Sequence, residues 1–425
     1  MTGDAEARTS ASRTRLGFIL LGGANFGVAI GYGIVLPFIP LVIERVSSPA
    51  PLAGHALHTG ALLGIYPLAM VVVAPLWGRF VDRYGGRRIL LVGLGGYAAA
   101  LVAFALANSL TSAYLIRAAA GVSAGAVLPA VAATVGSVID LPRRARLFAG
   151  VSVATLLGLL AGPVLSGTAY LAMQRFGEVK RLEPAIVGLP VAAAAAFVIL
   201  ILVGVIRWLP RSMLRPNATG CSEPVAWREA TPFLLSGFAV LLGLGAFEAV
   251  LPLAGKSQMR IDTAALGMLL AGCMLVMLAV QLMLFVMPGI HRNAKGGSIA
   301  AGFLVMAAGS ALLSAADSPW MAAAAVGLIA AGAAFLQPII AYSATVNAGG
   351  SPGALLGALT SAGSAGQAAG SFFGGALFGL LQARALWVVA ALLLLTALSV
   401  YASARKVAPC LDRQAVLRGR EADGR

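Results

Sequence analysis

Residues 78–88 read GRFVDRYGGRR and form a short charged segment between two apolar runs, 58–78 and 88–108. Basic residues in so short a loop could serve membrane topology alone, but topology does not require the acid Asp82. An acid at a helix end, flanked by arginines, can form a charge-assisted latch. Glycines in the same segment allow close helix approach and a tight turn. We assign a conformational latch to Gly78, Asp82, Arg83, Gly85, Arg87 and Arg88.

The composition makes lipid the natural solvent of this chain. Of its 425 residues, 60% are hydrophobic and 11% are charged, whereas soluble domains carry about 25% charged residues. The net charge of +15 comes from basic residues in short blocks between apolar runs, as the positive-inside rule produces in membrane proteins. We therefore expect a lipid bilayer as the surroundings of the chain, and no nucleic-acid partner.

The sequence offers no framework for a metal or a cofactor. Three cysteines, Cys221, Cys273 and Cys410, have no paired spacing, and the three histidines lie near the ends of predicted helices. The sequence contains no phosphate-binding loop of the Gly-x-x-x-x-Gly-Lys-Ser/Thr type, so an ATP-driven pump is unsupported. We expect a protein that is not an enzyme, with no metal site and no cofactor.

Twelve apolar runs are long enough to cross a bilayer, which takes about 20 residues in a helix. Six precede the polar, proline-containing stretch 207–228, and six follow it. Most Lys and Arg residues fall on the same side as the N-terminus, which indicates that both termini are cytoplasmic. The predicted spans are 16–44, 58–78, 88–108, 111–139, 146–172, 185–208, 231–254, 263–288, 297–316, 319–346, 353–382 and 384–404.

The two halves of the chain repeat sequence features at corresponding positions, since Leu36-Pro37 in the first half corresponds to Leu251-Pro252 in the second. Parallel repeats of this kind place a substrate cavity between the halves, near the membrane midplane. We expect an all-α, multi-pass protein of the cell membrane (the inner membrane, if bacterial) with two six-helix bundles around a central cavity. The expected divisions are a cytoplasmic tail (1–15), an N-terminal bundle (16–208), a cytoplasmic linker (209–230), a C-terminal bundle (231–404) and a basic cytoplasmic tail (405–425).

Segment 78–88 resembles the signature loop of the major facilitator superfamily, which has a Gly, then Asp-Arg, then Gly and a basic pair. It departs from that pattern at Gly86, where a basic residue is usual. The resemblance implies the major facilitator fold, and a loop that stabilises one conformation and releases it during transport. It also implies alternating access, in which the two bundles rock about the cavity.

Arg117 lies inside the predicted span 111–139, with Gly121 and Gly125 at four-residue spacing. An interfacial Arg can extend to a lipid headgroup, but a buried cation in a membrane is costly and usually functional. The stretch resembles the helix-4 motif of proton-coupled facilitators, although Ala120 stands where Gln is usual. The resemblance implies a role for Arg117 in proton transfer.

Within the predicted span 146–172, Gly158, Gly162 and Ser166 share one helix face, and Pro163 predicts a kink. The run closely resembles the antiporter motif of drug/proton antiporters, and this resemblance implies export. A kinked, glycine-faced helix can close tightly against its partner helix and seal one side of the cavity. We assign the motif to Gly158, Gly162, Pro163 and Gly167.

Glu248 is an acid inside the predicted span 231–254, away from its ends. A charged carboxylate in hydrocarbon is costly, so burial favours its protonated form and proton exchange. The alternative is a Glu that reaches headgroup water at the outer surface. We name Glu248 and Arg117 as proton-coupling candidates, with Tyr66 among the apolar walls of the cavity. Polar side chains that could line the cavity are Asn25, Tyr32, Gln281, Gln337 and Gln367.

These features together predict a secondary transporter that exports an amphipathic small molecule by alternating access, coupled to proton influx. Its partners would be the small-molecule substrate, protons and the lipid bilayer, and we expect a monomer. A dedicated metabolite exporter, for example of a siderophore, is an alternative in which Arg117 pairs with a substrate carboxylate. An uptake symporter with a fortuitously glycine-rich span 146–172 is a further alternative. The short loops leave no room for a partner domain, which argues against a scaffold or receptor.

Overall fold

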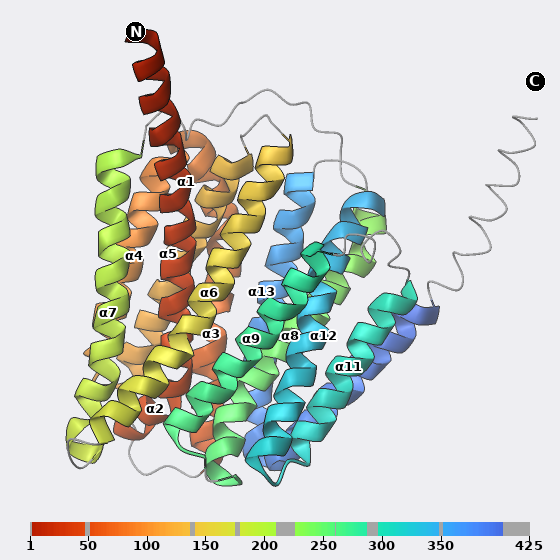
Figure 1. The fold of residues 1–425 in the computed structure, drawn as a ribbon. Helices are drawn as coiled ribbons and strands as arrows, with labels where there is room; N and C mark the ends of the chain where they lie inside the picture. The colour runs from red at the N-terminus through yellow and green to blue at the C-terminus, as the bar shows by residue number, and fades with distance from the viewer. Residues whose placement is uncertain are drawn as a thin grey trace, which may run out of the picture.

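The computed structural model is a bundle of helices, and no strand occurs in the part of the chain that it describes (Figure 1). In lipid, helices satisfy their backbone hydrogen bonds within one segment, which is why long apolar runs adopt them. The expected tail 405–425 lies outside the described residues, as does most of the expected linker 209–230. The described residues are 2–46, 52–136, 141–174, 179–209, 226–259, 261–286, 296–347 and 352–402.

The first half of the chain forms seven α-helices and one 3-10 turn. The predicted first span is interrupted because Pro37 lies in that turn. The first helix begins at Thr2, so the expected tail 1–15 is helical from that residue. The elements are α1 (Thr2–Val35), η1 (Leu36–Phe38), α2 (Ile39–Val46), α3 (Leu52–Tyr84), α4 (Gly86–Ala105), α5 (Leu110–Gly136), α6 (Leu141–Gln174) and α7 (Val179–Trp208).

The second half repeats this pattern, and over the described residues each of the twelve predicted spans overlaps a helical segment. Among the described residues, eleven segments are long and apolar enough to cross a membrane. Helix α13, which corresponds to the predicted span 353–382, is not among those eleven segments. The elements are α8 (Trp227–Ser257), α9 (Thr263–Val286), α11 (Gly296–Ser314), α12 (Pro319–Asn347), α13 (Pro352–Leu381), η3 (Gln382–Arg384) and the last helix, Ala385–Ala402.

Glycines let equivalent helices cross at backbone distance within each half. In the first half, a Cβ added to Gly158 of α6 would lie 2.6 Å from the carbonyl oxygen of Phe26 in α1. In the second half, a Cβ added to Gly370 of α13 would lie 2.0 Å from the carbonyl oxygen of Leu242 in α8. The two halves therefore repeat the same close helix packing, in addition to the repeated sequence features.

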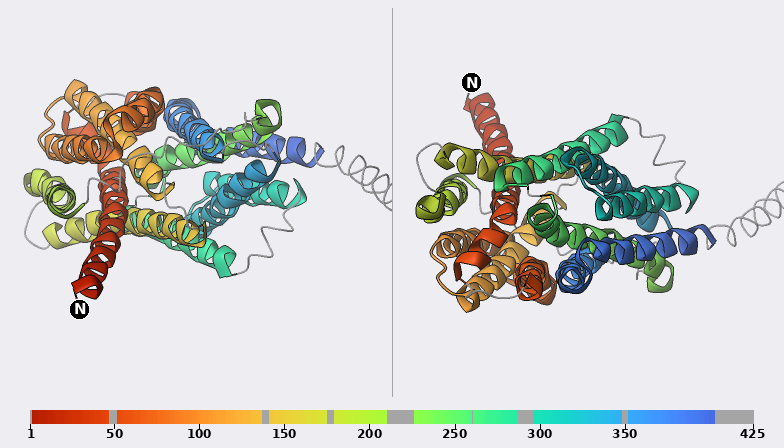
Figure 2. Two further views of the ribbon diagram at one scale, coloured as in Figure 1. Left: turned by 90° about the horizontal axis from the view of Figure 1, so that it is seen from above. Right: turned by 90° about the horizontal axis from the view of Figure 1, so that it is seen from below.

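The two halves lie side by side, with the helices up to α7 on one side and those from α8 onward on the other (Figure 2). Close helix crossings at glycine residues also join the two halves: α3 crosses α13, and α6 crosses α9. A Cβ on Gly60 would lie 2.3 Å from the carbonyl oxygen of Ser371, and one on Gly267 would lie 2.8 Å from that of Pro163. Both crossings lie toward the end of the bundle where α2 ends and α3 begins, opposite the N-terminus (Figure 1). We call this end the α2 end.

The crossing of α8 and α13 predicts a specific loss of stability. Gly370→Ala places a methyl group against backbone that cannot rotate away, and such overpacking costs about 1–3 kcal/mol. Gly272→Ala in α9 is the matched control, because a Cβ there meets no atom within 4 Å. Thermal unfolding of the two purified proteins in detergent should show a lower midpoint for Gly370→Ala only. Equal midpoints would contradict the close crossing.

Candidate functional site

Polar side chains from both halves meet in a buried hydrogen-bonded group. The Tyr32 hydroxyl in α1 donates to Oε2 of Glu248 in α8 at 2.8 Å. The Gln367 amide in α13 donates to the same oxygen at 3.0 Å and to the Tyr32 hydroxyl at 3.1 Å. Because Tyr32 belongs to the first half, these bonds link the halves. We call the group formed by Tyr32, Tyr66, Arg117, Glu248 and Gln367 the central cluster.

Arg117 is the cation of the central cluster and is 3% exposed. Its Nε donates to the carbonyl oxygen of Leu62 at 3.3 Å. Its guanidinium carbon lies 4.9 Å from the centre of the Tyr66 ring and 5.5 Å from that of Tyr32, within reach of cation–π attraction. Protein atoms therefore enclose the guanidinium, and it does not extend toward a lipid headgroup as the alternative interpretation expected.

Two glycines place the charged residues. A Cβ on Gly121, one turn after Arg117, would lie 2.3 Å from the carbonyl oxygen of Tyr66, so α5 touches the backbone of α3 at that point. A Cβ on Gly245, one turn before Glu248, would lie 2.3 Å from the carbonyl oxygen of Gln367. Residues three or four positions apart share a helix face. The crossing at Gly121 therefore brings Arg117 against α3, and the crossing at Gly245 brings Glu248 against α13. Each of these helices supplies a partner of the charged side chain.

The central cluster holds opposite charges that do not form an ion pair. Arg117 and Glu248, the latter 8% exposed, are the buried charged residues of the described chain. The ion pair found among the described residues joins two other side chains, Glu44 and Lys256. A buried charge is costly without a partner, and here the described hydrogen-bond partners are uncharged groups: the Leu62 carbonyl oxygen for Arg117, and Tyr32 and Gln367 for Glu248. Among the described residues, no group of His, Cys, Asp or Glu side chains could hold a metal ion.

The structure brings some of the predicted cavity residues together and leaves others apart. Tyr32 and Gln367 bind Glu248, as described above. Asn25 instead donates to the Thr155 hydroxyl at 3.4 Å, between α1 and α6. Gln281 in α9 and Gln337 in α12 are half-buried and make no hydrogen bond to the central cluster.

Tyr66 is the member of the central cluster whose role the sequence did not indicate. We predicted an apolar wall, but its ring lies against the Arg117 guanidinium. Its neighbour one turn earlier, Leu62, supplies the carbonyl oxygen that Arg117 binds. The sequence signal that could have indicated this role is that Tyr66 is an aromatic residue in a span made mainly of small and aliphatic residues.

The predicted latch lies at the end of the bundle opposite the α2 end, between α3 and α4. Gly85 has a φ of 85°, which fits the tight turn expected of it. Arg87 donates to the carbonyl oxygen of Ile206 at 2.7 Å and so binds the last turn of α7. A Cβ on Gly78 would meet no atom within 4 Å, so among the described residues no helix packs closely beside it. The side chain of Asp82 lies outside the described part of the structure.

The remaining latch arginines are exposed at the surface, whereas the antiporter-like motif of α6 packs against other helices. Arg83 and Arg88 are exposed, and the Arg83 guanidinium carbon lies 5.4 Å from the centre of the Tyr84 ring. A Cβ on Gly162 would lie 2.6 Å from the backbone of Gly33 in α1. A Cβ on Gly167 would instead lie 3.3 Å from the carbonyl oxygen of Ala264 in α9. Helix α6 therefore packs on its own half through one part of the motif and on the other half through another.

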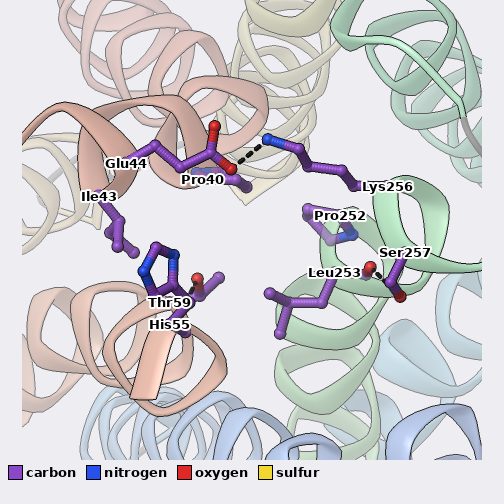
Figure 3. A pocket seen from close by; sticks show the side chains of 9 residues that line it. All are labelled: Pro40, Ile43, Glu44, His55, Thr59, Pro252, Leu253, Lys256 and Ser257. Atoms are coloured by element: carbon purple, nitrogen blue, oxygen red, sulfur yellow. Dashed lines mark hydrogen bonds and ion pairs between the residues drawn. The ribbon is translucent and has the colours of Figure 1, made fainter. Parts of the chain in front are cut away.

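A cavity of about 260 Å³ lies between the halves at the α2 end and contains no residue of the central cluster (Figure 3). Glu44 of α2 and Lys256 of α8 form an ion pair at its rim (Figure 3). The cavity therefore marks the place where the two halves would separate if the α2 end opened. It is lined by Pro40, Ile43, Glu44, His55, Thr59, Pro252, Leu253, Lys256 and Ser257.

Comparison with known proteins agrees with this architecture. The family model described as Major Facilitator Superfamily matches residues 21–350. Tetracycline resistance protein, class D, of Salmonella ordonez is 28% identical over 394 residues, which cover 90% of this chain and 95% of that protein. The class G protein of Vibrio anguillarum is 35% identical over 139 residues, which span 33% of this chain and 34% of the relative.

Among solved structures, the xylose transporter XylE from E. coli, in a partially occluded inward open conformation, superposes with a TM-score of 0.69 at 14% identity. The match covers 91% of this chain and 97% of that one, and it is a likeness of fold. Twelve helical segments in two halves, the loop 78–88 and the family match over most of the chain lead to one conclusion. This chain is a multi-pass membrane protein that belongs to the major facilitator superfamily.

Proposed function

We propose that the chain is a secondary transporter that exports an amphipathic small molecule by alternating access, while protons flow inward in exchange. The observation that carries this proposal is the hydrogen-bonded link between Glu248 and Tyr32 across the two halves, beside the buried Arg117. Relatives named for tetracycline resistance support export of a drug-like molecule. The glycine-faced α6, which contacts both α1 and α9, supports the same direction.

Protonation of Glu248 would change what holds the halves together. As a carboxylate it accepts hydrogen bonds from Tyr32 and Gln367 and is attracted to Arg117. As a neutral acid it loses that attraction. Because Tyr32 and Arg117 belong to the first half and Glu248 to the second, one proton alters the contact between the halves. An antiporter needs such a connection between its proton and its conformation.

We assign the α2 end to the external side, because both termini are proposed to be cytoplasmic. The structure then represents an inward-facing conformation whose halves meet at the external end, through α3 with α13 and α6 with α9. The latch at 78–88 lies at the cytoplasmic end, where it would hold the opposite, outward-facing conformation. The open space beside Gly78 supports this role, because it leaves room for a helix to approach when that end closes.

The proposed orientation predicts the side on which two cysteines lie. Cys221 and Cys410 belong to the expected linker and tail, outside the described residues, while Cys273 is buried. An impermeant maleimide should label neither residue in intact cells, and both after the membrane is permeabilised. Strong labelling of either one in intact cells would reverse the orientation.

Glu248→Gln tests the proton carrier, because glutamine keeps the shape and the hydrogen bonds but has no proton to release. We expect substrate transport driven by a pH gradient to fall to the level of protein-free liposomes, while downhill exchange of substrate continues. Glu229→Gln is the matched control, since Glu229 is an exposed acid on the same helix. Full gradient-driven flux through Glu248→Gln would remove this residue as the carrier.

The external seal can be tested at the ion pair of Glu44 and Lys256. Glu44→Lys replaces attraction with repulsion, and an exposed pair contributes up to about 1 kcal/mol. We expect an impermeant thiol reagent to label Thr59→Cys in the cavity about fivefold faster in this background. The double reversal with Lys256→Glu should restore the slow rate. An unchanged rate in Glu44→Lys would show that the pair does not seal the cavity.

A further inference from the structure

Arg117 carries a buried donor that no described residue uses. Its side chain is 3% exposed, and Nη2 has no hydrogen-bond partner among the described residues. A guanidinium has five N–H donors, and the described contacts use Nε, on Leu62, and the faces of the group, on Tyr32 and Tyr66. The Nη2 end of the guanidinium therefore remains available inside the protein for a group that is not part of the described chain.

Glu248 does not occupy that edge in this conformation. Both of its described hydrogen bonds, from Tyr32 and Gln367, end on Oε2. Tyr32 lies between the two charges, with its ring beneath the guanidinium and its hydroxyl on the carboxylate. One half of the protein thus presents a cation and the other presents an anion, separated by an aromatic ring.

We propose that the central cluster binds zwitterionic amphiphiles, meaning substrates with an acidic group and an amine on one apolar, aromatic body. The acidic group would accept a charge-assisted hydrogen bond from the unpartnered Nη2 of Arg117. The amine would bind the Glu248 carboxylate, and the substrate body would pack on the rings of Tyr32 and Tyr66. This inference rests on the proposed function, and it narrows the substrate class.

A zwitterion is also the charge type that agrees with proton exchange. A substrate amine and a proton would compete for the same Glu248 carboxylate, so each would displace the other, as antiport requires. A purely anionic substrate would instead be repelled by the charged carboxylate and would bind together with the proton. A purely cationic substrate would leave the buried donor of Arg117 unpartnered, as it is without substrate, and would gain no hydrogen bond there.

Three dyes that share the same xanthene ring system distinguish zwitterionic, cationic and anionic substrates. Rhodamine 110 carries amines and a free carboxylic acid, rhodamine 123 is its methyl ester, and fluorescein has the acid without the amines. We expect the purified protein to bind rhodamine 110 at least about tenfold more tightly than either of the others, as one charge-assisted hydrogen bond implies. Fluorescence polarisation measures the binding, and proteoliposomes with an imposed pH gradient measure the transport.

Arg117→Gln should abolish the preference for the free acid over the ester, by weakening rhodamine 110 at least about tenfold while changing rhodamine 123 little. Arg117→Lys keeps the charge without the planar fork, and should retain a reduced preference if the Gln variant does not fold. Arg45→Gln is the matched control, because Arg45 binds the carbonyl oxygen of Ala107 and lies outside the central cluster.

The outcomes separate this inference from the proposed function. If rhodamine 110 and rhodamine 123 are exported equally under the gradient, the transporter is confirmed and the zwitterion preference is wrong. The preference is equally overturned if Arg117→Gln weakens both dyes alike, or if rhodamine 110 does not bind. If dyes bind with the expected preference but the gradient moves none of them, the proposed proton-driven export fails while the binding site stands.

Discussion

Close crossing of helices at glycine is the constraint on which the rest of this structure depends. Where a Cβ would collide with a neighbouring carbonyl oxygen, as at Gly370 and Gly60, the helices meet backbone to backbone. Lipid supplies little hydrophobic drive for helices to associate, so close van der Waals contact must hold the bundle together. Close crossing at glycine joins helices within each half and between the halves, so the packing inside each half and the contact between the halves at the α2 end have one physical basis.

These crossings also determine where the charges lie. Gly121 brings Arg117 against α3, and Gly245 brings Glu248 against α13, each from one turn away. The result is a cation buried in the first half and an anion buried in the second half, without an ion pair between them among the described contacts. Isolated buried charges lower stability, and a scaffold would be more stable with apolar residues in their place. The proposed transport cycle, in which their partners change, gives a reason for their presence.

The contacts between the halves are unequal at the two ends of the bundle. At the α2 end, glycine crossings and the pair of Glu44 and Lys256 join them. At the other end lies the loop 78–88, where Arg87 binds α7 of its own half and the space beside Gly78 is open. Under the proposed alternating access, the contacts at the α2 end and the loop 78–88 at the other end would act on opposite sides of the transport cycle.

The sequence by itself determined the helices and the identity of the charged candidates. Each of the twelve apolar runs became helical because backbone in lipid has no other way to satisfy its hydrogen bonds locally, and a charged residue within such a run is conspicuous. Only the tertiary structure decided which polar residues meet. Tyr32 and Gln367 reach Glu248 while Gln281 and Gln337 do not. Such meetings join residues 335 positions apart, as in the bond between Gln367 and Tyr32. They depend on the rotation and crossing of whole helices, which packing against distant segments sets and local periodicity does not encode.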